Sequence, residues 1–529
     1  MSATTFIDRL AVRWRPLDPS VRDHARFDRL SRALAHGPLD AAIDAGAYRD
    51  EIVCVRTVAV PPLRVTADVT DDELLGWLAA AIAAAVAMAV SDTSEPAACV
   101  RYRSRAHAAL DVAVSLARGD RRREWAWRQL GLWPDPGEPA AAAGEHVAAA
   151  LAEAPGAVTA LLSAAAEAGA LAFLASLLGP HRLDAVVRAA WIARGYPLPG
   201  WNELLGPAAV PDDADFAQVT ALLARGALGR ELLRGTGLPP QSVAAASAAA
   251  LLGAEPSLPL RPVARVMPLV TAAALVSLDR SRQRDDGPSG LADPPGGGEA
   301  HVAPPPAADA AGHQPAPTPP IAPARQPAPA PRSAGAPQTA DAAPDSAATA
   351  PARGVATEFG GLPYLLHLVG RGGLPERAAR GELASTGLVR LLYEVGLRIL
   401  GRLVGPGQVP DREDAALACL CGRAPEAGWP RDIGARRLSA RVGRVADAEA
   451  ERLIAALRAA IEPSALAAAP EQALLTAACR RRARVVADPG WIDVCLDLAE
   501  VSTDVRRSGL DLDPGYLPWL GCVVRFVYG

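Results

Sequence analysis

Histidine and cysteine are the residue types in this sequence that most readily bind metals or act as nucleophiles. The chain contains eight histidines and seven cysteines. No two histidines have the His-Glu-x-x-His spacing of a zinc-binding helix, and no two cysteines form a Cys-x-x-Cys pair. Cys419 and Cys421 are separated by one residue and lack a second pair that would complete a zinc site. The spacing therefore predicts no metal centre, and the odd number of scattered cysteines indicates a reducing compartment.

The basic residues exclude several kinds of catalysis. All 54 basic residues are arginine, and the sequence contains no lysine. A phosphate-binding P-loop, a Schiff base, a protein-kinase site and a Ser-x-x-Lys pair each require a lysine amine. We therefore expect no bound cofactor and no enzymatic activity, although a Ser/His/Asp triad dispersed along the chain stays open as an alternative.

Two charged clusters allow both a functional and a structural interpretation. Asp212, Asp213 and Asp215 have the residue type for acid–base work or cation binding, but without a partner motif they favour helix capping. The four arginines between Arg480 and Arg484 form the densest basic cluster and have the charge for phosphate contacts. Since little positive charge surrounds them, we interpret them as a solvated or partner-facing patch.

Aromatic and glycine groups are ambiguous in the same way. Trp125, Trp127 and Trp133 lie close to arginines and have the composition of a base-stacking platform, but such aromatics more often anchor a core. Glycines at 370–373 and 405–407 resemble fragments of phosphate-binding loops and are better interpreted as turns.

Composition indicates a mainly α-helical protein of several domains. The chain has 529 residues, half of them apolar and only 4% aromatic, because alanine, leucine and valine dominate. Its net charge of −4 gives no general attraction for nucleic acid or anionic membranes. The N-terminus shows no signal-peptide pattern, so we expect a cytoplasmic protein. The apolar run from Leu74 to Val90 predicts a buried helix rather than a membrane span.

The expected fold is mainly α, with helical bundle or solenoid-like regions, a small α+β element at the N-terminus and a small β element at the C-terminus. A disordered Pro/Ala linker is expected to split these regions. The expected segments are an α+β unit (1–92), an Ala-rich helical domain (93–279), the linker (280–355), a second helical domain (356–464) and a C-terminal element containing a β-hairpin (465–529).

In the N-terminal unit, alternating apolar and arginine residues predict a strand at 6–15. Helical spacing follows at 27–34 and again at 39–43. A second strand is expected at 51–60, ahead of the helix at 74–90. The three acidic residues just before that helix complement its N-terminus.

In the next part, short helices are predicted at 160–178 and 183–193. The composition changes at Arg280, where proline, alanine and glycine begin to dominate up to Gly354. Such a segment buries too little apolar surface to offset its conformational entropy, so we expect a semi-rigid spacer.

Beyond the linker, apolar residues at helical spacing from Leu388 to Ile399 predict an amphipathic helix, and helices are expected to continue to Ile461. The strand-like run 483–487, an Asp-Pro-Gly turn and alternating apolar residues at 492–498 predict a β-hairpin. The apolar run 522–528 predicts a strand that places the C-terminus in a sheet.

Three stretches of the chain resemble the tape-measure family of contractile injection systems, which are phage-tail-like particles. The first is the start, Ile7-Asp-Arg-Leu-Ala-Val with Phe27-Asp-Arg-Leu and Glu51-Ile-Val-Cys-Val-Arg. The second is Glu358-Phe-Gly-Gly-Leu-Pro-Tyr-Leu-Leu-His367, and the third is Leu517-Pro-Trp-Leu. The residues singled out as partner-contact or family-motif positions are Phe359, Gly360, Gly361, Leu362, Leu517, Pro518 and Trp519.

The resemblance implies a structural or assembly component that contacts tube, baseplate, sheath or cap proteins while a particle is built. A physical ruler requires one long continuous helix, whereas this sequence has helices interrupted by Gly and Pro and a linker at mid-length. An adaptor or assembly factor is therefore favoured over a length-setting rod. The alternative is a helical-repeat adaptor or regulator unrelated to any particle, which would use the linker to bring two partners together.

Overall fold

The described residues cover most of the chain outside its Pro/Ala-rich segment. The computed structural model describes residues 24–35, 51–63, 69–91, 98–135, 138–139, 142–198, 211–285, 354–381, 383, 387–405, 407–425, 439–462 and 464–529. The predicted strand at 6–15, the predicted helix at 39–43 and nearly all of the predicted linker lie outside these ranges.

Among the described residues, the N-terminal part contains two helices and two short strands. They are α1 (His24–Ala35), β1 (Ile52–Val55), α3 (Asp71–Ser91) and β2 (Cys99–Tyr102). The helical spacing at 27–34 is confirmed by α1, in which Leu30 and Leu34 are buried. The strand expected at 51–60 is shorter, and its antiparallel partner β2 lies in a stretch for which only helices were expected.

Helix α3 is long and apolar enough to cross a membrane, but the pairing of its flanking strands argues against a single crossing. Val55 at the end of β1 pairs with Cys99 at the start of β2. If α3 crossed a membrane alone, residues 56–70 would have to cross back, and they include two arginines and two prolines. The expectation of a buried helix holds for only part of its surface, since Trp77 is 48% and Met88 64% exposed.

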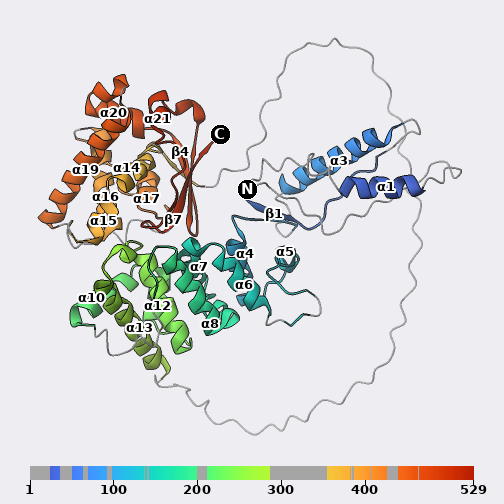
Figure 1. Cartoon of the computed structure of the whole chain (residues 1–529), viewed down its shortest axis with the longest axis horizontal. Helices are drawn as coiled ribbons and strands as arrows, with labels where there is room; N and C mark the ends of the chain where they lie inside the picture. Colours follow the sequence, from blue (N-terminus) through green and yellow to red (C-terminus); the bar gives the residue numbers. More distant parts are fainter. Residues whose placement is uncertain are drawn as a thin grey trace, which may run out of the picture. The chain divides into compact units, whose positions relative to one another are not determined.

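A first helical body follows β2 (Figure 1). Its elements are α4 (Arg105–Ala117), α5 (Glu124–Gln129), α6 (Ala142–Ala152), the short 3₁₀ turn η2 (Pro155–Ala157), α7 (Val158–Glu167), α8 (Leu171–Ile192), α10 (Asp213–Leu223), α11 (Ala227–Leu233), α12 (Pro240–Ala254), η3 (Leu258–Leu260) and α13 (Val263–Asp285).

The Ala-rich helix α12 is the centre of this body. It packs against α7, α8, α10, α11 and α13, and twelve of its residues are buried. Alanine side chains are small, so neighbouring helices approach α12 from several sides. α12 thus contacts helices that come both before and after it in this body.

Several local predictions fall in this body. Trp127 is fully buried and its Nε1 donates to Asp111 at 3.0 Å, so this tryptophan is a core anchor. Asp212 and Asp215 form a capping box at the start of α10, which confirms helix capping there. The helix expected at 160–178 is interrupted between α7 and α8, and Gly179 with φ 71° kinks α8 where a break was expected.

The second body contains the residues after the Pro/Ala-rich segment. Its elements are β3 (Val355–Thr357), η4 (Leu362–Tyr364), α14 (Leu365–Arg371), α15 (Leu374–Ala379), α16 (Leu388–Val404), α17 (Ala415–Leu420), α19 (Ala440–Ala460), η5 (Ala465–Ala468), α20 (Glu471–Cys479), β4 (Ala483–Asp488), β5 (Trp491–Leu496), η6 (Leu498–Glu500), α21 (Thr503–Ser508), β6 (Gly515–Leu517) and β7 (Cys522–Tyr528).

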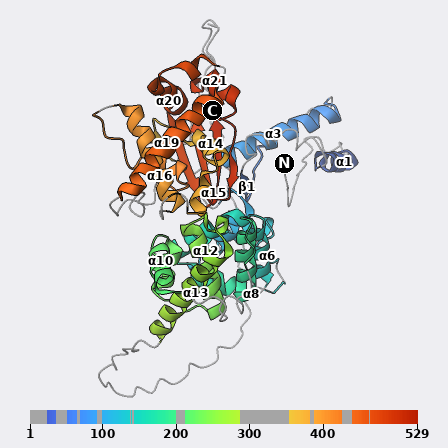
Figure 2. The same cartoon turned by 60° about the vertical axis from the view of Figure 1, so that its left-hand side comes forward.

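The strands of this body form one five-stranded mixed sheet in the order β3-β4-β5-β7-β6. The predicted hairpin is confirmed as β4 and β5, and the predicted C-terminal strand as β7, which runs parallel to β5. Leu498 was expected in the second hairpin strand but lies in η6. Helices cover one face of the sheet (Figure 2). Val485, Val494 and Val524 lie on this face and are fully buried.

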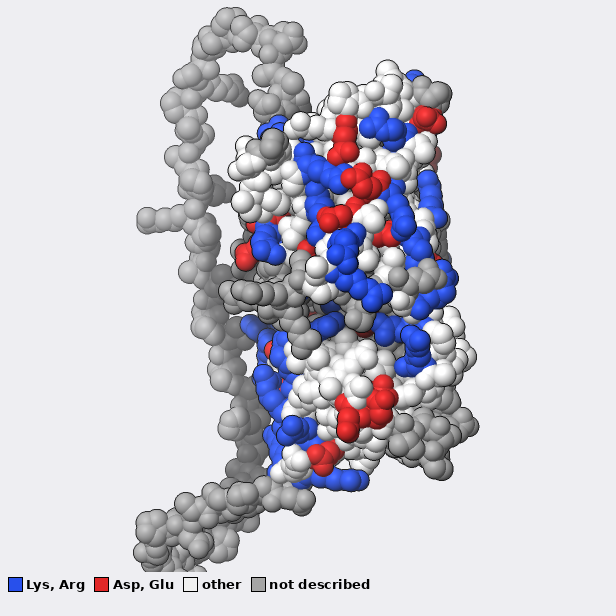
Figure 3. Space-filling view, turned by 90° about the vertical axis from the view of Figure 1, so that its left-hand side faces the viewer, with Lys and Arg blue, Asp and Glu red and all other residues white. Residues whose placement is uncertain are grey.

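The amphipathic helix predicted at 388–399 is confirmed by α16, in which the predicted apolar positions Leu388, Leu391, Leu392, Val395 and Ile399 are all buried. Its outward side forms ion pairs with its neighbours α19 and α20. Arg398 pairs with Asp447, and Arg402 pairs with Glu451 and Glu471. Figure 3 shows that arginine and acidic side chains interleave on the upper half of the face toward the viewer.

Order extends further into the predicted linker than expected, because α13 continues through Arg280 to Asp285. Residues on both sides of the Pro/Ala-rich segment belong to a single compact unit. The segment 286–353 therefore connects two parts of one unit.

Candidate functional site: the open face of the C-terminal sheet

The Phe-Gly-Gly-Leu stretch joins β3 to η4 at the corner between α20 and β4. The N–H groups of Gly360 and Gly361 donate to the carbonyl oxygens of Arg481 and Cys479, at 2.8 and 3.1 Å. Leu362 is fully buried. The motif is therefore a packing element that fastens the edge strand β3 to the rest of the sheet.

Both glycines are required by close approach of the backbone. A Cβ on Gly360 would lie 2.2 Å from the Cβ of Ala483, and a Cβ on Gly361 would lie 2.1 Å from the carbonyl oxygen of Ala478. No larger residue fits at either position unless the backbone moves.

The Leu-Pro-Trp-Leu stretch forms the connection from β6 to β7. Leu517 is half-buried at the end of β6, Pro518 is exposed, and Trp519 and Leu520 are buried. The structure thus brings both predicted motifs into the same sheet. Leu362 and Trp519 are core residues, which leaves Pro518 and the half-buried Phe359 and Leu517 as the motif side chains within reach of a partner.

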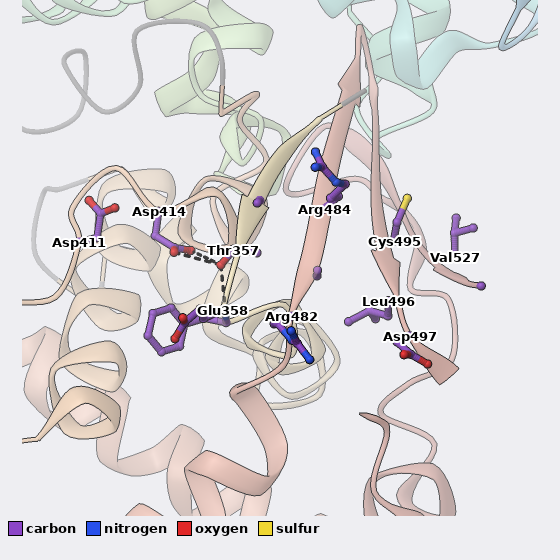
Figure 4. Close-up of a pocket in the computed structure, with 14 residues that line it drawn as sticks. Thr357, Glu358, Asp411, Asp414, Arg482, Arg484, Cys495, Leu496, Asp497 and Val527 are labelled. Atoms are coloured by element: carbon purple, nitrogen blue, oxygen red, sulfur yellow. Dashed lines mark hydrogen bonds between the residues drawn. The ribbon is translucent and has the colours of Figure 1, made fainter. Parts of the chain in front are cut away.

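Part of the outer face of this sheet is open. The open part follows one row across β3, β4, β5 and β7 that contains Ala356, Arg484, Cys495 and Val527, which are register partners. Ala356 and Arg484 are exposed, and Val527 is 39% exposed. These four residues line a broad hollow of about 880 Å³ that also borders Phe359 (Figure 4).

Acidic residues outnumber arginines around this hollow. Glu358, Asp411, Asp414 and Asp497 line it together with Arg482 and Arg484. Asp414 accepts hydrogen bonds from the hydroxyl of Thr357 at 2.9 Å and from the N–H of Ala416 at 2.8 Å, while burial raises the pKa of its carboxyl. Asp497 similarly caps η6.

The arrangement has a mixed apolar and charged character that suits a protein surface. Its lining residues contain no histidine and a single cysteine, Cys495. Within the described part of the chain, no three His, Cys, Asp or Glu side chains are grouped closely enough to hold a metal ion. These lining residues offer apolar contact through Val527 and Ala356, with Arg484 between them and acidic groups nearby.

The basic cluster at 480–484 is only partly solvated. Arg480 pairs with Glu358 at 3.4 Å, and Arg482 pairs with Glu500 at 3.3 Å. Arg481 is buried, lies 6.0 Å from the centroid of the Tyr364 ring and donates to the carbonyl oxygens of Glu500 and Ala477. The interpretation as a solvated patch is wrong for Arg481, because β-strand alternation turns this side chain toward the core.

Sequence reasoning missed the open row itself. The signal was the alternation within the predicted strands, where Arg484 falls between the buried Ala483 and Val485, and Val527 follows the buried Phe526. The extent of the open row depends on the pairing of β3 with β4 and of β5 with β7, which no local pattern in the sequence specifies.

The cysteines lead to a prediction about thiol reactivity. Five are buried (Cys54, Cys419, Cys421, Cys479 and Cys522), and two, Cys99 and Cys495, are partly exposed. Burial raises the pKa of Cys54 to about 11 and that of Cys479 and Cys522 to about 12, so these thiols stay protonated at pH 8.

With an aromatic disulfide reagent at pH 8, we expect no more than two thiols to react in the native protein within minutes. Seven should react after denaturation in guanidinium chloride. Replacement of Cys99 or Cys495 by serine should remove one reactive thiol each, and a native count above two would contradict the structure.

Comparison with protein-family models, with curated proteins and with solved structures finds no match to this chain.

Proposed function

We propose that this protein is a structural or assembly component of a contractile injection particle and acts through protein–protein contacts. The observation that carries the proposal is the position of the two C-terminal stretches that resemble the tape-measure family. Residues 358–367 follow the edge strand β3, and residues 517–520 join the opposite edge strand β6 to β7, so both stretches adjoin the sheet that carries the open face. This shared position supports the proposal, which rests on the resemblance of the two stretches.

The open face is the contact surface in this proposal. Val527 offers apolar area, as does Leu498, which is 48% exposed and whose N–H donates to the carbonyl oxygen of Gly529, while Glu358, Asp411 and Asp497 offer acidic groups. Apolar centres with polar margins are typical of protein interfaces. The partners we propose are tube, baseplate, sheath or cap proteins, met in the cytoplasm during assembly.

Helix lengths favour an adaptor or assembly factor over a molecular ruler. The longest described helix, α13, has 23 residues, which is about 35 Å at 1.5 Å per residue. The helices pack around α12 and against the sheet instead of continuing end to end. A rod that measures a particle requires a continuous helix many times longer.

The test is affinity purification of the tagged full-length chain from its native cells, followed by mass spectrometry. We expect tail-like structural proteins to co-purify with the wild-type protein. Val527→Arg should reduce their recovery at least about tenfold, because it places a charge in the apolar part of the open face. Circular dichroism should show unchanged folding.

Leu275→Arg is the matched control, since Leu275 in α13 is 40% exposed and lies far along the chain from the sheet. Its recovery of partners should equal that of the wild type. Recovery of signalling proteins without any tail-like protein would favour the helical adaptor unrelated to a particle. Equal loss in both variants would refute the role of the open face.

A further inference from the structure

The two helical bodies meet through a buried ion cluster. Arg103, in the turn between β2 and α4, reaches Asp488 and Asp493 of the β4–β5 hairpin at 3.1 and 2.5 Å. Asp493 also accepts two hydrogen bonds from Arg525 of β7, at 2.9 and 3.1 Å. The Arg103 side chain is only 10% exposed and that of Asp493 only 7%, so both charges depend on each other for compensation.

An aromatic contact lies beside this cluster. The ring of His107 in α4 meets the Trp491 ring at the start of β5 edge-on, with centroids 5.0 Å apart. Trp491 packs against the core of the first body although it belongs to the sheet of the second. Its burial thus depends on the contact between the bodies.

Three glycines allow the backbones to approach closely. A Cβ on Gly490 at the hairpin turn would lie 2.8 Å from the Cβ of Ala157. A Cβ on Gly156 would lie 2.4 Å from the Tyr516 ring, and a Cβ on Gly521 would lie 3.1 Å from Pro256. Packing this tight is found inside domains and in permanent interfaces, not between loosely tethered domains.

A second region of contact lies at the end of α12. Arg423 of the second body donates to the carbonyl oxygen of Ala254 at 3.4 Å. Glu255 is 1% exposed, and its carboxylate oxygen would lie 2.0 Å from a Cβ on Gly387. The second body therefore covers a charged side chain that would otherwise face solvent.

We infer that the surface of the first body around Arg103, Ala157 and Ala254 is a binding site for the part 354–529, and that this binding holds without the covalent connection. The connection only raises the effective concentration of one part near the other. The contacts themselves combine compensated buried charges, an aromatic anchor and close backbone packing. Cutting the chain within 286–353 should leave a stable two-piece complex.

The experiment uses the full-length chain with a site-specific protease sequence inserted between Gly335 and Ala336. The folded protein is cleaved and then chromatographed by size at about 1 μM. We expect both pieces to elute together at the volume of the uncut protein. Elution of the pieces at two separate volumes would overturn the inference.

Two variants of the same chain test whether the ion cluster is responsible for the binding of the two pieces. Arg103→Glu turns an attractive contact into repulsion against two carboxylates, so association of the cut pieces should weaken on the order of 100-fold. Arg105→Glu is the control, because Arg105 pairs with Glu153 inside the first body.

The uncut Arg103→Glu chain should keep its helical circular dichroism, which separates loss of binding from loss of folding. If Arg103→Glu unfolds the uncut chain, Arg103→Met removes the cation without adding repulsion and serves in its place. Cut pieces of both Arg103 variants that stay together as well as those of Arg105→Glu would refute the assigned surface.

Discussion

Replacement of Asp493 by alanine is expected to lower the free energy of unfolding by about 3–5 kcal/mol. Asp493 is 5% exposed and is the carboxylate shared by Arg103 and Arg525. Its removal takes the shared carboxylate away from two poorly solvated guanidinium groups. The free energy of leaving these charges buried without it is larger than the net contribution of the ion pairs that are lost.

Asp488→Ala provides the comparison for this prediction. Asp488 also pairs with Arg103, but its side chain is 42% exposed, so its loss should cost no more than about 1 kcal/mol. Urea denaturation followed by circular dichroism measures both values. Similar losses in the two variants would show that burial of the cluster does not govern its strength.

Replacement of Gly361 by alanine should cost about 3 kcal/mol, at the upper end of the usual penalty for overpacking. The added methyl group would lie 2.1 Å from the carbonyl oxygen of Ala478 in α20. This oxygen belongs to the backbone, so it cannot move away as the end of a flexible side chain can. The N–H of Gly361 would also lose its hydrogen bond to Cys479 as the backbone shifts. We expect β3 to detach from the sheet, so that the open face loses the strand at its edge.

Gly370→Ala is the matched substitution, nine residues further along in α14. A Cβ there meets nothing within 4 Å, so alanine should stabilise the helix by about 0.5–1 kcal/mol. Thermal unfolding of the two variants should therefore shift in opposite directions. A destabilised Gly370→Ala protein, or an unchanged Gly361→Ala protein, would contradict the packing described at these sites.

Elements with strong local patterns were predictable. The apolar stripe from Leu388 to Ile399 predicted α16, and the alternation on both sides of Asp-Pro-Gly predicted the hairpin, because each pattern repeats with the period of its own element. The capping box at Asp212 and Asp215 was predictable for the same reason, since a cap acts within four residues.

The short strands β2 and β3 were not predicted. β2 has four residues and β3 has three, too few to show a period, and each exists because of a partner distant in the sequence. β3 pairs with β4 more than a hundred residues later, beyond several helices. Arg481 was misjudged for a related reason, because its direction depends on the backbone of α20 and β4 rather than on its charge.

The sequence by itself determined the mainly helical class, the hairpin, the C-terminal strand and the absence of lysine chemistry, since these depend on composition and on patterns within one element. Tertiary structure alone decided that the parts before and after the Pro/Ala-rich segment form one unit and that one sheet face stays open. It also decided why glycine occupies positions 360 and 361. These features arise from contacts between distant segments, which carry no periodic signal in the sequence.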